Sequence, residues 1–308
     1  MPWGLPVSDD LAELLATGER AAFHGRPASG VVALELAFEK AREDGLGAEA
    51  TAAAWLLGVC LAAVGRFGGS LAVLDPLVAA GTSDSPERRL FAALAASTSA
   101  AVRRQLGQPD LARDLDESAL VFSGGAPEAA FDATIGLAAD AVIAQDAESA
   151  ADCIQRARQL AEGHHDWWRQ RVRLAWVEAE LAILVGDPTA AQELLLSAVH
   201  LAEASGAPRH VAKTLLLLAV SQVQAGQLGE AESTLRRSAT LAESLGALPT
   251  LWPSRALLGA LLEDSAPAES AKSLAAARGG VIAIADDLPD DLRDIWLDRP
   301  DVTALLGG

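Results

Sequence analysis

The 308-residue sequence contains no tyrosine, and only 4% of its residues are aromatic. Its two cysteines, Cys60 and Cys153, stand far apart and form no Cys-x-x-Cys spacing. This scarcity excludes a disulfide framework and a cysteine-based zinc site, and it indicates a cytoplasmic protein. Basic residues are also few: 24 stand against 42 acidic ones, which gives a formal net charge of −18. The phosphate backbone of a nucleic acid and an anionic membrane surface would both be repelled, so neither is a predicted partner.

Long apolar runs are missing as well. Each apolar stretch meets a charged residue or a glycine before it reaches the ~18 residues that a membrane span requires. Residues 1–6 include no basic segment of the kind that opens a secretory signal. We therefore expect a protein that is neither secreted nor inserted into a membrane.

Alanine and leucine dominate the sequence, and β-branched residues are too scattered to form alternating strands, which predicts an all-α fold. Short turns of similar composition recur along the chain, separated by 38 to 42 residues. They begin at Gly25, Gly65, Gly107, Gln145, Gly186 and Gly226. Recurrence at a nearly fixed interval is typical of an array of structural repeats.

Side-chain size repeats with the turns. The residue seven positions before each turn and the residue five positions after it are small. The residue nine positions after is large and apolar in five of six units, with Asp116 as the exception. Two antiparallel helices approach closely only where the crossing point carries no bulky side chain, and a large apolar residue then fills the adjacent groove. The pattern therefore predicts stacked helical hairpins.

On these offsets, residues 9–279 resemble the tetratricopeptide (TPR) repeat superfamily. The sequence lacks the family's usual Trp and Tyr in the first helix, and its interval is near 40 where the family has 34. The resemblance implies a right-handed superhelical solenoid of about seven helical hairpins. We divide the chain into a repeat array, residues 1–280, and a C-terminal capping segment, residues 281–308.

The capping segment is similar to the ends of repeat modules in large bacterial regulators and cyclases. Asp290 is expected to N-cap a helix that carries Leu292, Ile295 and Trp296 and covers the last apolar face. The chain contains no phosphate-binding Gly-x4-Gly-Lys-Ser/Thr loop and no Gly-x-Ser-x-Gly elbow, and we predict no catalytic residue, cofactor or metal.

In the TPR superfamily the first helix of each hairpin faces the concave side. The family's inward positions correspond here to Trp55, Arg104, Asp132, Arg173, Trp176, Glu180, Lys213 and Gln224. Most other inward positions are apolar, so we expect an apolar groove with a few central charges that binds a protein or peptide. Arg173 and Glu180 could equally be solvated surface charges, with Trp176 as a packing residue.

The acidity of the chain favours a basic partner, including a basic or amphipathic helix, and leaves a homo-oligomer open. One TPR subfamily grips acidic peptide C-termini with Lys and Asn at fixed inward positions. The Asn position here holds Val59, Glu180 and Val220, which disfavours that specific mode.

Two motifs suggest other functions. His164, His165 and Asp166 could contribute to a metal site, but adjacent histidines point apart and no second cluster supplies further ligands. We expect Gly163 to end one helix and Asp166 to cap the next, with the following two tryptophans packed at the junction. The isolated His24, His200 and His210 are expected to bond backbone carbonyls near helix ends.

The segment at residues 286–290 matches the Asp-Asp-x-x-Asp signature of Mg²⁺-dependent isoprenoid synthases, which is the third functional candidate. Pro289 would interrupt the helix that this signature requires, and no second aspartate-rich motif follows. The second candidate is a regulatory sensor whose groove binds a small molecule or a signalling peptide. A closed pocket would favour the small molecule, and an open channel would favour the peptide.

Overall fold

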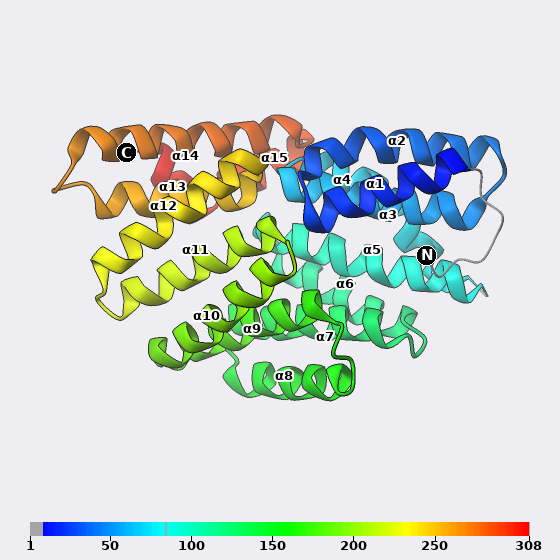
Figure 1. Ribbon diagram of the computed structural model, residues 1–308, viewed down its shortest axis with the longest axis horizontal. Coiled ribbons are helices and arrows are strands. Elements are labelled where there is room, and N and C mark those ends of the chain that lie inside the picture. The colour runs from blue at the N-terminus through cyan, green and yellow to red at the C-terminus, as the bar shows by residue number, and fades with distance from the viewer. Residues whose placement is uncertain (1–8, 84, 308) are drawn as a thin grey trace.

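The computed structural model describes residues 9–83 and 85–307, and these residues fold into helices without β-strands (Figure 1). The helices of the described residues pack as seven consecutive pairs followed by two short helices. They are α1 (Asp9–His24), α2 (Pro27–Glu43), α3 (Gly47–Val64), α4 (Phe67–Ala79), α5 (Pro86–Gln105), α6 (Pro109–Phe122), α7 (Pro127–Ile143), α8 (Ala147–Ala161), α9 (Trp168–Leu184), α10 (Pro188–Ala204), α11 (Pro208–Gln224), α12 (Leu228–Leu245), α13 (Leu248–Leu261), α14 (Pro267–Asp287), α15 (Asp290–Leu297) and α16 (Pro300–Gly307), with a 3₁₀ turn at Ala80–Thr82. The predicted all-α class is confirmed.

Turn chemistry explains where the helices stop. Each of the six predicted turns lies between the two helices of a pair. Gly65, Gly107, Gly186 and Gly226 adopt a left-handed backbone with φ between 74° and 87°, which a glycine adopts without a steric penalty. In the α7–α8 turn Gln145 takes the same conformation with φ 59°, a strained geometry for a residue that has a Cβ.

The small residues serve the expected purpose within a pair. A Cβ added to Gly58 on α3 would meet the Leu74 side chain of α4 at 2.5 Å. The Ser70 hydroxyl, from the small position of α4, donates to the Gly58 carbonyl at 2.8 Å. The absence of side-chain bulk therefore sets how closely the paired helices approach.

The odd-numbered helices form the inside of the superhelix. From α1 to α13, each odd-numbered helix contacts the next odd-numbered helix, whereas the even-numbered helices contact their sequence neighbours. We call the surface that α1, α3, α5, α7, α9, α11 and α13 turn toward one another the inner wall.

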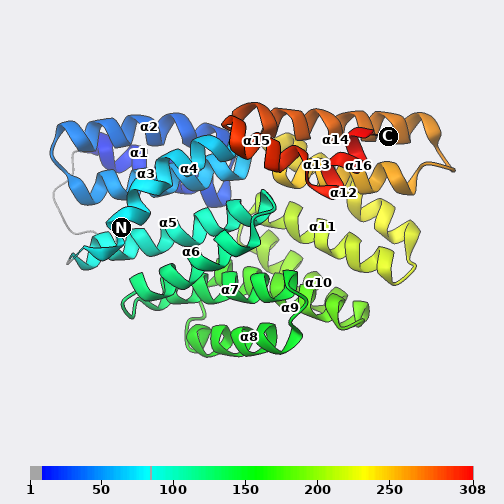
Figure 2. The ribbon, with the colours of Figure 1, turned by 180° about the vertical axis from the view of Figure 1, so that it is seen from behind.

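The superhelix also closes upon itself, which the repeat pattern did not predict. α11 contacts α1, α13 contacts α3 and α14 contacts α4, so the last hairpins lie beside the first two (Figures 1 and 2). We call these the closing contacts. They turn the array into a ring and bring residues of different repeats together across its centre.

A close backbone approach joins α4 to the end of α14. The Asp287 carboxylate accepts hydrogen bonds from the Gly69 backbone amide at 3.0 Å and from Arg66 Nε at 3.2 Å. It thereby caps the N-terminus of α4 from another part of the chain. A Cβ at Gly68 would lie 2.2 Å from the Asp287 carbonyl oxygen, so this contact requires glycine.

The two short C-terminal helices cover a core that spans both ends of the ring. Trp296 is 1% exposed, packs edge-on against Phe67 and Trp252, and donates from its indole to the Val281 carbonyl at 3.0 Å. The expectation for Asp290 was wrong by one residue, because Pro289 is the N-cap and Asp290 begins the helix. Ile295 is 37% exposed and does not join this core.

One helix, α3, is long and apolar enough to cross a membrane by length and composition alone. It is an inner helix of the second hairpin, and 61% of the apolar window is buried inside the fold. Its hydrophobicity is accounted for by packing.

Candidate functional site

Seven of the eight predicted inward residues are buried or half-buried on the inner wall. Trp55 comes from α3, Arg104 from α5, Asp132 from α7, and Lys213 from α11. Arg173, Trp176 and Glu180 come from α9. The eighth, Gln224, is exposed at the last residue of α11.

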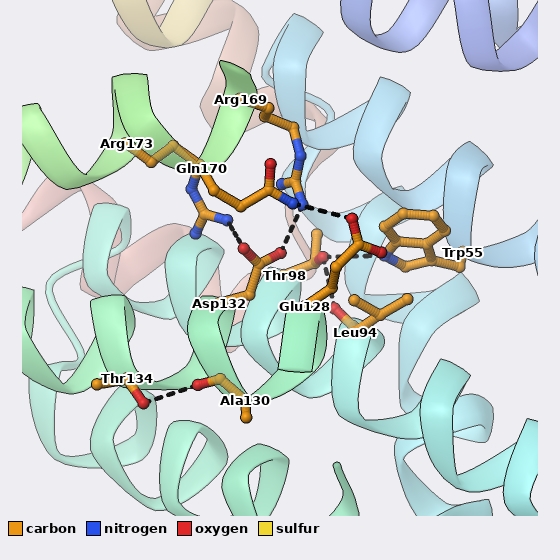
Figure 3. Close-up of polar contacts among 10 residues, drawn as sticks. All are labelled: Trp55, Leu94, Thr98, Glu128, Ala130, Asp132, Thr134, Arg169, Gln170 and Arg173. Atoms are coloured by element: carbon orange, nitrogen blue, oxygen red, sulfur yellow. Dashed lines mark hydrogen bonds and ion pairs between the residues drawn. The ribbon is translucent and has the colours of Figure 1, made fainter. Parts of the chain in front are cut away.

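Trp55 anchors an aromatic region between the first three hairpins. Its indole donates to the Thr98 hydroxyl on α5 at 3.3 Å, and that hydroxyl donates to the Leu94 carbonyl at 2.7 Å (Figure 3). The Phe23 and Phe91 rings lie with their centroids 6.3 and 6.2 Å from the Trp55 ring. The indole is therefore held in one orientation while part of it stays exposed.

Asp132 binds two arginines of the next inner helix. It accepts hydrogen bonds from Arg169 at 3.0 Å and from Arg173, both on α9 (Figure 3). Burial favours the neutral carboxyl, but the two guanidinium groups outweigh that effect and lower the pKa of Asp132. The Arg169 guanidinium also lies 5.5 Å from the centre of the Phe23 ring, so this group reaches across to α1.

Arg104 lies between two buried aspartates. It donates to Asp116 at 2.6 Å and to Asp140 at 2.8 Å. Asp116 is the exception at the large apolar position, and a Cβ at Gly136 would collide with its carboxylate at 2.1 Å. Burial raises the pKa of Asp116 to about 7, although Arg104 favours the charged form. This group therefore replaces a leucine contact with an ion triad in the third hairpin.

Trp176 joins α9 to α11. Its indole donates to the Thr214 hydroxyl at 2.8 Å, and its ring stacks on His210 with the centroids 5.6 Å apart. The Lys213 ammonium lies 4.3 Å from the centre of the Trp176 ring. Trp168 packs edge-on against His210 at 5.0 Å. Aromatic and cationic side chains thus meet at this point of the wall.

The positive charges beside Trp176 are poorly compensated. Burial lowers the pKa of Lys213 to about 8 and that of Arg209 to about 10. Glu180 favours the charged Lys213, while Arg173 disfavours it. The wall is therefore cationic here, which differs from the apolar groove with isolated charges that we expected from the sequence.

The closing contacts bring the end of α1 beside Trp168 of α9. The His24 ring lies 5.1 Å from Trp168, and its Nδ1 is 2.9 Å from the Ser205 carbonyl oxygen. His24 thus bonds a backbone carbonyl as expected, but one that belongs to a distant hairpin. His210 does not follow that expectation, because it is 2% exposed and its Nδ1 has no hydrogen-bond partner among the described residues.

The histidine-rich junction is a packing site. Gly163 follows α8 with φ 82°, as expected, but the N-cap of α9 is Trp167 and not Asp166. The His164 ring stacks on Trp167 at 4.0 Å, and Trp167 packs edge-on against Phe131. Within residues 9–83 and 85–307, no group of three or more His, Cys, Asp or Glu is placed to hold a metal ion.

The Asp-Asp-x-x-Asp signature is divided by a helix boundary, as Pro289 predicted, because α14 ends at Asp287 and α15 begins at Asp290. Asp286 accepts a hydrogen bond from Arg293 at 2.9 Å, and Asp287 makes the closing contact to α4. The two cysteines are free, with Cys60 buried in the core and Cys153 half-buried.

Two surface depressions lie away from the predicted residues. One, of about 600 Å³, lies between α1 and α2 and is lined by residues that include Leu14, Leu36 and Glu39. The other, of about 670 Å³, is lined by residues of α9 and α10 such as Arg171 and Leu194.

Two solved structures share this architecture. A Rap protein in complex with competence and sporulation factor superposes with a TM-score of 0.65 at 13% identity, over 97% of this chain and 86% of that chain. Aspartyl phosphate phosphatase F from Bacillus subtilis superposes with a TM-score of 0.53 at 15% identity, over 99% and 84%. No family model and no curated protein matches the chain. The fold is a TPR-like helical repeat solenoid.

Sequence reasoning missed three residues that complete the wall, namely Arg169, Arg209 and His210. They lie in the first turns of α9 and α11, outside the inward positions of the repeat pattern. The ring closure brings α1 beside α11, and the Phe23 ring of α1 lies against Arg169 of α9. The only signal in the sequence was the placement of basic residues at helix N-termini, where positive charge is unfavourable unless another group compensates it.

Proposed function

We propose that this protein is a non-enzymatic, cytoplasmic scaffold or adaptor that binds a protein or peptide segment on its inner wall. The observation that supports this is the half-buried Trp55 indole, together with the half-buried Lys213 ammonium over the buried Trp176 ring, on a wall of packed helices. Such groups provide large contact area at a low entropic cost, and tryptophan in particular is enriched at binding hot spots. The solved Rap complex shows that a protein of this fold holds a bound factor.

The wall and the outer surface would select different partners. The chain carries a net charge of −18, whereas the part of the wall beside Trp176 is cationic. A basic or amphipathic helical partner would therefore engage the acidic outer surface, and the segment bound inside would carry less positive charge. The resemblance of residues 281–308 to the ends of regulator repeat modules, which stays a prediction from the sequence, agrees with such an adaptor role.

Selection of peptides from a random library on the purified full chain tests this proposal. Peptides recovered on the wild-type protein should bind a Trp55→Phe/Lys213→Gln variant at least about tenfold more weakly, because both contacts lie on the wall. A Lys272→Gln variant is the matched control, since Lys272 is exposed on α14. Equal binding to the wall variant and the control would contradict the proposal.

A regulatory sensor is the second candidate, and the closing contacts favour it. Polar groups such as the Asp287 cap and the His24–Ser205 bond hold the ring closed between distant hairpins. A ligand that touches both α1 and α11 would stabilise the closed form through its higher affinity for that form. Small-angle scattering should then show a smaller radius of gyration for the peptide complex than for the free protein, and an unchanged radius would argue against this function.

A further inference from the structure

Four cationic side chains meet where α9 and α11 face the centre of the ring, and we call this group the cationic centre: Arg169, Arg173, Arg209 and Lys213. Asp132 and Glu180 face them directly, and the neighbouring Arg104 and Asp116 also act on Arg173 or Lys213. Positive groups therefore outnumber the carboxylates around the cationic centre, inside a chain whose net charge is −18. An excess of positive charge in one half-buried group of side chains requires an explanation.

The cations that lack a carboxylate partner are both on α11. Arg169 and Arg173 both donate to Asp132, so their charge has a partner. In contrast, Arg209 Nε is buried without a hydrogen-bond partner, and no described carboxylate lies within ion-pair distance of Lys213. Buried donors of this kind carry a desolvation penalty that a protein normally avoids, so such a group in a native structure requires an explanation, such as a bound ion or a functional role.

His210 provides an independent observation. It is 2% exposed, it lies between the Trp168 and Trp176 rings, and its Nδ1 has no hydrogen-bond partner among the described residues. Burial first, and then the positive charges of all four centre residues, hold the pKa of His210 well below its usual range. A neutral imidazole can either donate or accept one hydrogen bond at that nitrogen.

The N-terminus of α11 adds to the positive potential at the cationic centre. Arg209 and His210 occupy the first turn of α11, directly after Pro208. The N-cap residue Ala207 has no side-chain oxygen to bond the free amides of that turn. Arg209 and Lys213 are four residues apart and therefore share one face of the helix. The unpaired groups and the positive end of the helix thus coincide.

We propose that the cationic centre, with His210, binds a carboxylate group of the ligand through Arg209 and Lys213. This inference rests on the proposed function when the carboxylate is the C-terminus or an acidic side chain of a bound peptide. A free dicarboxylic acid presents the same chemistry, and guanidinium and ammonium groups bind both. The residues involved differ from the Lys and Asn clamp that the sequence disfavours.

The first arm of the test uses a small probe and is independent of peptide binding. The full-length protein is unfolded thermally in succinate and in succinamide, with sodium chloride added to equalise the ionic strength. Succinate should raise the unfolding temperature relative to succinamide, because a ligand that binds only the native state stabilises it. The increase should vanish in an Arg209→Gln/Lys213→Gln variant and persist in the matched control Arg171→Gln/Lys272→Gln, whose two cations are exposed.

The Arg209→Gln/Lys213→Gln variant should fold, because it removes cations that burial disfavours, and its far-UV circular dichroism verifies this. An equal unfolding temperature of the wild-type protein in succinate and succinamide would overturn the carboxylate site, whatever the peptides do.

The second arm compares library-selected peptides with a free C-terminal acid and with a C-terminal amide. The acid should bind the wild-type protein about tenfold more tightly, which is a typical gain for a charge-assisted contact, and the difference should disappear in the Arg209→Gln/Lys213→Gln variant. A succinate effect without any peptide binding would leave the carboxylate site standing and refute the proposed function. Equal affinity of acid and amide together with a succinate effect would assign the site to a free dicarboxylate.

Discussion

Two charged regions of the inner wall differ in how their charges are compensated. In the third and fourth hairpins Arg104 is placed between Asp116 and Asp140 at hydrogen-bond distance. Beside α11, Arg209 and Lys213 lack such partners among the described residues. A buried cation with carboxylates at hydrogen-bond distance specifies packing, whereas a buried cation without one destabilises the free protein and is retained where a ligand compensates it. The comparison separates the structural part of the wall from the part that we assign to binding.

The paired region should give the largest loss of stability when it is broken. Arg104→Met leaves Asp116 and Asp140 buried without their cation, and we expect a loss of about 3–5 kcal/mol in the free energy of unfolding, measured by urea denaturation. Arg42→Met is the control, since its pair with Glu39 is exposed and should contribute less than about 1 kcal/mol.

The double variant Arg104→Met/Asp116→Leu restores the leucine found at this position in other hairpins and should recover part of the loss. A loss for Arg104→Met no greater than that of the control would show that the triad is not structural.

Opening the ring should affect both regions unequally. In Gly68→Ala the new Cβ meets the Asp287 carbonyl at 2.2 Å, so α4 and α14 must separate, and overpacking of this kind costs about 1–3 kcal/mol. The radius of gyration from small-angle scattering should increase, and the succinate effect should weaken because the cationic centre becomes hydrated.

Gly229→Ala is the control for that substitution, because nothing lies within 4 Å of its added Cβ. If both variants behave alike, the closing contact between α4 and α14 does not hold the ring together.

The pH dependence of stability should distinguish two buried aspartates, Asp116 on α6 and Asp132 on α7. The pKa of Asp116 is raised from 3.8 to about 7, so the folded state holds a proton that the unfolded state has released, and stability falls as the pH rises through that window. The pKa of Asp132 is lowered, so its contribution is present above 3.8 and is lost as the pH falls through the folded-state pKa.

Asp116→Asn should therefore remove a decline between about pH 4 and 7, whereas Asp132→Asn should remove a loss below about pH 4. Urea denaturation across this range measures both effects. Identical pH profiles for the two variants would refute the assignment of opposite shifts.

The smallest expected effect concerns Lys213 itself. Because burial lowers its pKa from 10.5 to about 8, the charged form destabilises the free protein at pH 7. Stability should rise as the pH increases from about 8 to 10.5, where the folded state has lost a proton that the unfolded state keeps. The facing charged groups are Glu180, Arg173, Arg209 and Arg104.

Lys213→Gln should remove that rise and should stabilise the protein at pH 7 by up to about 1 kcal/mol. Thermal unfolding measures the change, and a variant less stable than the wild-type protein would show that Lys213 is already compensated.

The sequence predicted local features well. Glycine and proline at the turns, small residues at helix crossings and the helical propensity of the chain act between neighbouring hairpins, so the boundaries of helix pairs could be read directly. Asp116 stood out because it broke the repeat, and its explanation required only the adjacent α5 and α7.

Contacts across the ring could not be predicted in this way. The pairing of His24 with Ser205, or of Gly69 with Asp287, depends on the small rotation of each hairpin summed over the whole array. A pattern that repeats every 40 residues does not reveal the total rotation of the array. Arg209 and His210 were missed for this reason, whereas Trp176 and Lys213 were found from their offsets to the turns.

Site-specific photo-crosslinking tests the binding role of the inner wall most directly. A benzophenone amino acid replaces Trp55 on the wall in one variant and Leu196, which is 48% exposed on the outer helix α10, in another. A library-selected peptide should crosslink from position 55 and not from position 196. Capture from position 196 alone would place the binding surface on the outside of the ring and contradict the account.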